Sequence, residues 1–435
     1  MKKQLILCFS LILGSSIVNV GKDASAIPAF ARKYHTACST CHIAFPARNG
    51  FGEAFRNNGY RFPDGADEEM VKEEPIQLGS DAYKKQFPNA IWPSDIPNMP
   101  SLGFLARLNA TSSKVNNSGK LRGSDLGEEL DVFFAGTITE QISYIGDFGM
   151  TNSESPTLGR LQLLWTFKPG VSMALGTVGF PEQFDMISMS AGGDRNGYAA
   201  QLPSPNKGAE LRLTGNSGSV GYSLLAGFGR NPQSDGTNEQ PADGVLEHGG
   251  TFIDSKFARA SVKFGGAGLL SGAGGSFGNQ AIGLDNSVTL GLNIFHSEKG
   301  GNVNNNDEYI SGLTKTAWGG DVRANYGNMR LVAQYARFNE VIDPVTKIDY
   351  GKRTGVSLEG DYWFYPWLFA AVRYENMKDD KNGKYTKVIP GIGALLRPNC
   401  KIGLEYVDVT KSTILEEAPN ILPDSSVSFY TQLGF

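Results

Sequence analysis

Four residues near the start of the chain form a cluster whose types and spacing can do chemistry. His35, Cys38, Cys41 and His42 fall within eight residues in the stretch YHTACSTCHIAFP. Its core, CSTCH, is the attachment pattern of a c-type haem, in which two thiols add to the vinyl groups and the adjacent imidazole binds the iron. A redox-active CxxC pair and half of a zinc site are the alternatives, but the motif lacks a βαβ context and a second pair of zinc ligands. The pattern therefore predicts one covalent haem c attached to Cys38 and Cys41, with His42 as an axial ligand of the iron.

The sixth position of the iron has two candidate ligands. His35 precedes Cys38 by only three residues and is hard to bring to the opposite face of the haem, so it is interpreted as a solvated side chain. Met99 and Met70 are separated from the motif by enough chain to reach that face, and a thioether raises the reduction potential relative to a second histidine. The sequence does not choose between them, and an open sixth position stays possible.

A short helix is predicted directly after the motif, over residues 49–58. Phe51, Ala54 and Phe55 share one side of it, and Gly59 stands where a left-handed cap is expected. Aromatic side chains are expected to cover the haem edge and keep water from the iron, namely Phe45, Phe51, Phe55 and Tyr60.

The flanking segments predict export and a linker. Residues 1–26 carry Lys2 and Lys3, an apolar stretch and the small-residue site Ala24-Ser25-Ala26, which together indicate a signal peptide. The cytochrome segment then covers residues 27–74. Residues 75–100 are rich in proline and show no helical or strand period, which predicts an extended linker.

The remaining residues, 101–435, alternate apolar and polar side chains with a period of two. Val288, Leu290, Leu292 and Ile294, for example, oppose Thr289, Gly291 and Asn293. Other segments place charged residues on the polar face, including Glu210, Arg212, Asp321, Arg323, Glu359, Asp361, Arg373 and Glu375. Such charges are tolerable in a membrane only where that face is wet, so the pattern is typical of a transmembrane β-barrel with a water-filled lumen.

The connections predict the number of strands and their orientation. Strands are expected to begin near residues 101, 129, 141, 158, 170, 208, 218, 255, 286, 316, 328, 353, 366, 384, 399 and 425, which makes sixteen. A soluble sandwich or propeller is the alternative, but tight turns alternating with longer polar loops favour an outer-membrane barrel with both termini on the periplasmic side. One connection, 265–285, is long where a tight turn is expected, and its Gly and Ser content suggests a flexible excursion.

The composition supports a strand-rich chain and excludes one class of partner. The chain of 435 residues contains 54 Gly and 11% aromatic residues, a mixture typical of strands and turns. Its net charge of −4 and the lack of a basic run argue against a nucleic-acid partner. The fold class predicted is thus mainly β: a sixteen-stranded antiparallel transmembrane β-barrel preceded by a small α-helical c-type cytochrome segment.

The N-terminal stretch resembles a known family. The segment IPAFARKYHTACSTCHIAFPARNGFGEAFRNNGYRFP and the later WPSDIP are similar to the fused monohaem cytochrome-porins of the bacterial outer membrane, which include the outer-membrane iron(II)-oxidising cytochromes c. The motifs cover residues 27–100, and architecture alone extends the resemblance over the barrel. A similar cytochrome segment occurs in proteins that are not tied to iron oxidation, so the resemblance supports a haem-porin fusion more strongly than it supports iron oxidation.

The resemblance implies one-electron transfer across the outer membrane. The expected partners are extracellular Fe(II) or another small redox substrate, a periplasmic c-type cytochrome or other soluble carrier, and outer-membrane lipid. If the chain is an enzyme, the resemblance implies an iron(II):cytochrome c oxidoreductase. Two alternatives stay open: electron export to an extracellular acceptor, and a solute porin in which the haem-bearing segment is a plug.

Overall fold

A computed structural model describes the larger part of the chain. The described residues are 30, 34, 36–44, 47–63, 76–77, 85–86, 95–96, 101–114, 121–138, 141–151, 154–180, 186–187, 200, 202, 207–230, 255–271, 277–279, 283–297, 302–303, 309–310, 314–340, 351–380, 383–412 and 425–434. The predicted signal peptide lies outside them. Within these ranges no helix has the length and apolar character needed to cross a membrane.

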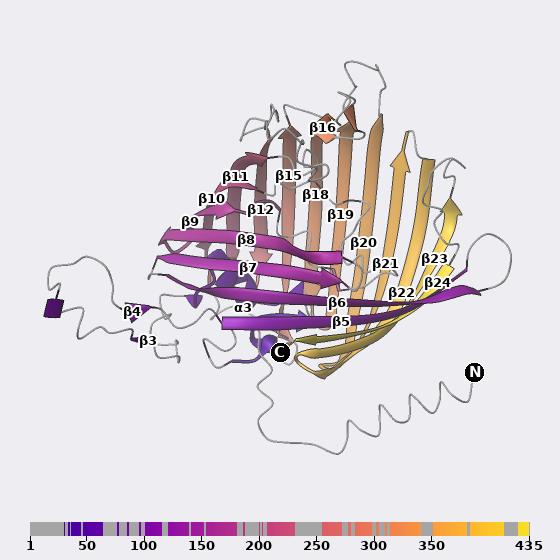
Figure 1. The fold of residues 1–435 in the computed structure, drawn as a ribbon, viewed down its shortest axis with the longest axis horizontal. Coiled ribbons are helices and arrows are strands. Elements are labelled where there is room, and N and C mark those ends of the chain that lie inside the picture. The colour runs from indigo at the N-terminus through magenta and orange to yellow at the C-terminus, as the bar shows by residue number, and fades with distance from the viewer. Residues whose placement is uncertain are drawn as a thin grey trace.

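Sixteen strands form one closed antiparallel barrel, which confirms the predicted fold class (Figure 1). They are β5 (Ser101–Lys114), β6 (Leu121–Thr137), β7 (Ile142–Thr151), β8 (Glu154–Lys168), β9 (Val171–Gly176), β10 (Lys207–Ser217), β11 (Val220–Arg230), β12 (Ser255–Gly265), β15 (Ser287–Ser297), β18 (Thr314–Tyr326), β19 (Met329–Glu340), β20 (Lys352–Tyr365), β21 (Leu368–Asp379), β22 (Gly383–Arg397), β23 (Cys400–Ser412) and β24 (Ser425–Gly434). Each strand pairs with its neighbours in the sequence of barrel strands, and β24 pairs with β5 to close the wall. Closure leaves no unpaired strand edge.

Short elements precede the barrel and decorate its ends. They are the 3-10 turn η1 (Cys38–Thr40), β1 (His42–Ala44), β2 (Ala47–Arg48), α3 (Gly50–Asn57), β3 (Ile76–Gln77), β4 (Asp95–Ile96), β13 (Phe277–Asn279), β14 (Leu284–Asp285), β16 (Asn302–Val303) and β17 (Tyr309–Ile310). The predicted helix is confirmed as α3, and Gly59 follows it with φ 72°. A side chain would be strained in that left-handed conformation, so glycine is suited to the site. The predicted linker contains one small ladder, because β3 pairs with β4.

Strand β6 departs furthest from its predicted start. β6 begins at Leu121, eight residues before the predicted start near 129. Polar residues and glycines interrupt the apolar alternation there, yet the backbone continues to pair with β5 as far as Lys114 opposite Leu121. Backbone pairing therefore extends the strand beyond the part with a clear side-chain period.

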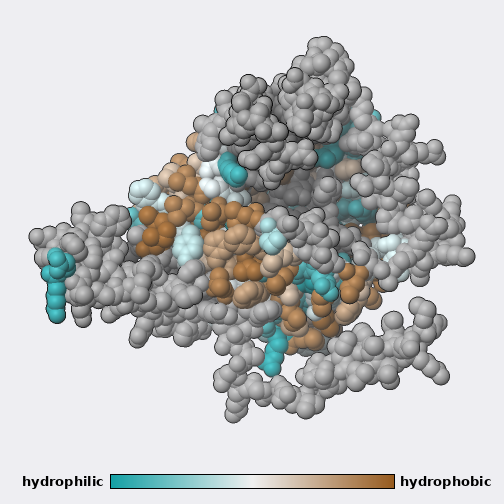
Figure 2. Space-filling model, in the orientation of Figure 1, coloured by the Kyte–Doolittle hydropathy of each residue, from teal (hydrophilic) through white to brown (hydrophobic). Residues whose placement is uncertain are grey.

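The outward face of the barrel is apolar. Figure 2 shows brown, hydrophobic residues gathered over the described part of the wall. The exposed apolar side chains alternate along the strands with buried ones, and include Val288, Leu290, Leu292, Ile294, Val356, Leu358, Tyr362, Phe364, Leu404, Tyr406, Val427 and Phe429. At the short-turn end the rings of Tyr365 and Trp367 stack, with centroids 5.6 Å apart. An apolar belt edged by aromatic residues is the outer surface of a transmembrane barrel.

The inward face carries the predicted charges, but much of it is packed. Glu359 and Arg373 are 0% exposed, and Arg330 donates to Asp361 across 2.8 Å. The predicted wet face is therefore wrong for these residues. Two segments that are not part of the wall fill the space: the helix α3 region, and the described residues of the connection between β9 and β10.

The connection 265–285 is also different from the expected flexible excursion. Its described parts turn inward at the short-turn end, where Ala267, Leu269 and Leu284 are buried. Lys263 and the backbone N–H of Ala267 both contact Asp285. Its length is explained by the contacts that it makes with the N-terminal segment, described below.

Candidate functional site

The CSTCH motif forms a single tight turn. The backbone N–H of Cys41 donates to the carbonyl oxygen of Cys38 at 3.2 Å, which closes the 3-10 turn η1. His42 follows as the first residue of β1. The two thiols and the imidazole are thus presented by one turn of backbone and the residue after it.

Asn49 fixes this turn to helix α3. Its Nδ2 donates to the carbonyl oxygens of Ser39 at 3.1 Å and Thr40 at 3.0 Å. Its Oδ1 accepts from the N–H of Gly52 at 2.8 Å, which caps the helix N-terminus. The Asn49 N–H also donates to the carbonyl oxygen of Cys41 at 3.0 Å. One side chain therefore sets the position of the helix relative to the motif.

Gly52 lets the helix lie against the motif. A Cβ atom at this position would come within 2.1 Å of the carbonyl oxygen of Cys41 and 2.8 Å of its carbonyl carbon. Both are backbone atoms, so they cannot move aside as a flexible side chain would. Only glycine fits this close approach.

The two motif thiols are free and held in their protonated form. Burial raises the pKa of Cys38, and burial followed by the proximity of Cys38 raises the pKa of Cys41 to about 12. A redox-active CxxC pair has the opposite property, a thiol pKa lowered by nearby positive charge or a helix N-terminus. Within the described residues, moreover, no three His, Cys, Asp or Glu side chains gather as a metal site.

Helix α3 lies inside the barrel lumen. Glu53, which is 6% exposed, accepts from Nζ of Lys263 at 3.1 Å and forms an ion pair with Arg323. Burial alone would raise the pKa of Glu53, but the Arg323 and Lys263 cations outweigh it and hold that pKa well below its usual range. Lys263 and Arg323 are inward-facing residues of β12 and β18, so the helix is held by the wall itself.

The C-terminal end of helix α3 is hydrogen-bonded to the connection 265–285 and to β7. Nδ2 of Asn57 donates to the carbonyl oxygen of Leu269 at 2.8 Å, and Nδ2 of Asn58 donates to that of Leu270 at 3.0 Å. Across the lumen, Oγ of Ser143 donates to the carbonyl oxygen of Gly59 at 2.7 Å. Since β7, β12 and β18 all contact this segment, it fills the lumen near the short turns as a plug, which Figure 1 shows as the indigo ribbon within the wall. We call described residues 30–63 the lumen plug.

Apolar contacts complete the plug. Ile43, Ala44 and Ala47 belong to a buried cluster with the wall residues Trp363, Phe369 and Ala371 and with Ile187 and Leu284. On the other side, Phe30 and Tyr60 pack against Ala135, Ile145, Leu164 and Ala174 of β6 to β9. Phe30 and Tyr60 stack with ring centroids 5.1 Å apart, and Phe55 meets Phe30 edge-on at 5.3 Å.

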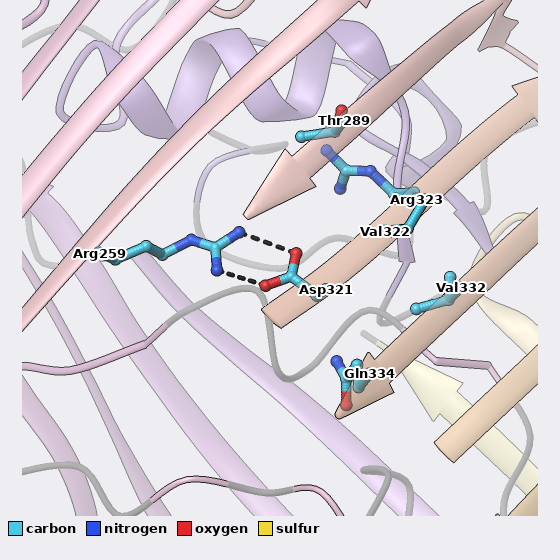
Figure 3. A pocket seen from close by; sticks show the side chains of 7 residues that line it. All are labelled: Arg259, Thr289, Asp321, Val322, Arg323, Val332 and Gln334. Carbon is cyan, nitrogen blue, oxygen red and sulfur yellow. Dashed lines mark hydrogen bonds and ion pairs between the residues drawn. The ribbon is translucent and has the colours of Figure 1, made fainter. Parts of the chain in front are cut away.

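The wall beside the plug carries a charged network. Figure 3 shows the inward side chains of a small cavity formed by β12, β15, β18 and β19, where Nη2 of Arg259 donates to Oδ1 of Asp321 at 2.9 Å. Nδ2 of Asn293 also donates to Asp321, at 3.2 Å. Arg323 lines the same cavity and contacts Glu53. The polar wall is thus continuous with the contact that holds the helix.

The predicted site residues fall into two groups. Cys38, Cys41 and His42 lie on the turn and strand described above, while Phe51, Phe55 and Tyr60 are in the plug. His35, Phe45, Met70 and Met99 lie outside the described residues, so the predicted sixth ligands stay predictions. Sequence reasoning missed Asn49, Glu53 and Lys263. The signal for Asn49 was a cap residue before a helix, but the partners of Glu53 are more than 200 positions away.

The residues present fit a c-type haem. Two free thiols and a histidine share one turn, Gly52 leaves room for the helix against it, and Asn49 fixes its carbonyl groups. Cys38 and Cys41 would hold the group covalently, and His42 would bind its iron.

Comparison with known proteins supports the barrel. No family model matches the chain, and no curated protein matches it. Among solved structures, OmpF of Salmonella typhi in complex with daunomycin is 13% identical with a TM-score of 0.50, over 77% of this chain and 98% of that one. The DcaP outer membrane channel of Acinetobacter baumannii is 12% identical with a TM-score of 0.44, over 77% and 96%. A mutant of the Rh. blastica porin is 8% identical with a TM-score of 0.45, over 78% and 100%.

At such identities the likeness concerns the fold alone, and the OmpF match is the one that carries weight. The porin likeness and the apolar belt point to the bacterial outer membrane. The chain is therefore a porin-like, closed sixteen-stranded β-barrel whose lumen holds the CSTCH segment.

Proposed function

We propose that this protein is a cytochrome-porin of the bacterial outer membrane, which carries one electron between an extracellular donor and a periplasmic electron carrier. Fe(II) is the leading donor, as the resemblance of the N-terminal segment implies. The observation that carries the proposal is the position of the CSTCH turn, which belongs to a plug held in the lumen by Glu53 and the wall residues Lys263 and Arg323.

The chemistry follows from what the turn can hold. A c-type haem bound at Cys38, Cys41 and His42 supplies one-electron transfer through its iron. Asn49 and Gly52 orient the turn, and the plug excludes water by packing its aromatic residues against the wall. The proposal places the short turns, and with them the plug, on the periplasmic side, where a soluble cytochrome can reach it.

The lumen of the barrel shortens the distance between an external donor and a single haem. The apolar belt of such a barrel is about 25 Å tall, and one haem cannot form a chain of carriers across it. A lumen brings the dissolved donor toward the plug instead. Electron export to an external acceptor would use the same parts in the reverse direction, and the haem potential distinguishes the two.

A stopped-flow experiment tests the proposal. Purified protein in its ferric form is mixed with Fe(II) in the absence of oxygen, and reduction is followed in the haem spectrum. We expect reduction by Fe(II), followed by reoxidation when a soluble cytochrome c is added. A haem that Fe(II) does not reduce would rule out the iron-oxidising role.

A solute porin with a haem-bearing plug is the second candidate, which the porin-like fold favours. Liposome swelling separates it from the first. Swelling that is equal in the wild type and in the Cys38→Ala/Cys41→Ala variant, with no loss of electron transfer in cells, would support the porin.

A further inference from the structure

The connection between β9 and β10 enters the lumen from the wall. Its residues Val178, Phe180, Ala200 and Leu202 are buried in a cluster with inward-facing side chains of β11 to β19, including Phe257, Phe295 and Phe338. Phe180 meets Phe257 edge-on with ring centroids 5.6 Å apart. We call the described residues of this connection, 177–180, 186–187, 200 and 202, the lumen loop.

Further along, the lumen loop reaches a distant part of the wall. Met186 and Ile187 are both 0% exposed. The backbone N–H of Ile187 donates to Oε1 of Glu359 on β20 at 2.6 Å. Since six strand pairs separate β10 from β20 in the barrel order, the loop crosses the lumen at this point.

This crossing brings the residue after Met186 into a buried cluster with the lumen plug. Ile187 belongs to the same buried cluster as Ile43, Ala44 and Ala47 of the lumen plug. Met186 directly precedes Ile187, and His42 directly precedes Ile43. The Cα atom of each is therefore about 3.8 Å from the Cα atom of a cluster member. Two segments distant in the sequence thus bring a thioether and the motif histidine to the border of one buried cluster.

The other methionines of the described chain lie elsewhere. Met150 and Met173 alternate with inward-facing residues and occupy outward positions, and Met329 is 58% exposed. Met377 is near the long-loop end of β21, whereas the cluster contains Phe369 and Ala371 at the other end of that strand. Among described methionines, Met186 alone is buried beside the plug.

We propose that Met186 of the lumen loop supplies the sixth ligand of the haem iron, opposite His42. The inference rests on the proposed function, because it requires a haem at Cys38 and Cys41. A thioether in a dry site is a soft axial ligand that raises the reduction potential. Because Met186 belongs to the lumen loop and the haem would be carried by the lumen plug, the iron would gain its sixth ligand only when the plug is docked in the lumen.

The test is ligand substitution in the full-length, haem-loaded protein. Met186→Leu keeps an apolar side chain of similar size, Met186→His offers a different ligand, and Met150→Leu is the matched control at an outward position. Covalent haem is measured first by denatured absorbance spectra, and barrel folding by circular dichroism. The ferric spectrum is then examined for the long-wavelength sulfur-to-iron charge-transfer band, and the potential is titrated.

We expect the wild type and Met150→Leu to show the band, and Met186→Leu to lose it with haem content unchanged. Met186→His should restore a six-coordinate low-spin spectrum at a lower potential than the wild type. The proposal is overturned if Met186→Leu keeps the band, if Met70→Leu or Met99→Leu removes it, or if the wild type lacks it. Absence of covalent haem from the wild type would instead refute the proposed function.

Discussion

Replacing Glu53 by Gln should loosen the lumen plug while leaving the barrel folded. The carboxylate is buried and lies 3.1 Å from Nζ of Lys263, with Arg323 on its other oxygen. The amide has nearly the same shape but no charge, so two buried cations lose the negative charge that compensates them. Lys263 still has the Asp285 carboxylate 2.9 Å from its Nζ, so this cation stays partly compensated in the variant.

The magnitude follows from the burial of all three groups. Removing one partner of a buried ion pair costs about 3–5 kcal/mol, which is roughly a 100- to 4,000-fold change in the docking equilibrium. Because Asp285 stays with Lys263, we expect the lower end of this range.

Single-channel conductance in planar bilayers is a direct assay of plug release. Urea is raised through concentrations at which the β-sheet circular dichroism of the barrel does not change, and the midpoint of the conductance increase is compared among variants. Glu53→Gln should shift the midpoint to lower urea by the free energy above divided by the slope of the docking free energy with urea concentration. Glu128→Gln, which removes an exposed carboxylate of β6, is the control. An unchanged midpoint for Glu53→Gln would refute the assignment of this ion pair as the lock.

Three further predictions use the same conductance assay. Gly52→Ala should destabilise the plug by about 1–3 kcal/mol, because its Cβ would meet Cys41 backbone atoms, whereas Gly360→Ala, with nothing within 4 Å of the new Cβ, should have little effect. Asn49→Ala should cost about 1 kcal/mol for the lost cap and more for the lost donors, while Asn49→Asp keeps the cap; equal losses would contradict the double role. Because the pKa of Glu53 is lowered by docking, its contribution is fully present above the ordinary value of 4.5 and is lost as pH falls below it. The midpoint should therefore be constant from neutral pH down to about pH 5 and should drop in stronger acid. A midpoint that falls between pH 7 and pH 5 would contradict this.

Local signals made the wall and the helix predictable. The period of two placed Val288, Leu290 and Leu292 outside and Thr289 inside, as the structure has them. The apolar side formed by Phe51, Ala54 and Phe55, with Gly59 after it, predicted α3. Each of these signals lies within a few residues of the element that it predicts.

The sequence left open whether the haem-bearing segment plugs the lumen, because the contacts that hold it join distant parts of the chain. Glu53 and Lys263 are separated by 210 positions, and nothing near either residue indicates the other. For the same reason, the connection 265–285 seemed merely long and flexible, although Leu269 and Leu270 accept hydrogen bonds from the plug. The inward charges were expected to face water, but the plug and the lumen loop cover several of them, among them Glu359.

The central claim is that a haem is covalently attached to the turn inside the barrel. Mass spectrometry of the peptide that contains Cys38 and Cys41, prepared from protein purified out of outer membranes, tests it most directly. The account predicts one haem on this peptide, bonded through both thiols. A peptide carrying free thiols or a Cys38–Cys41 disulfide, with no haem mass, would contradict it.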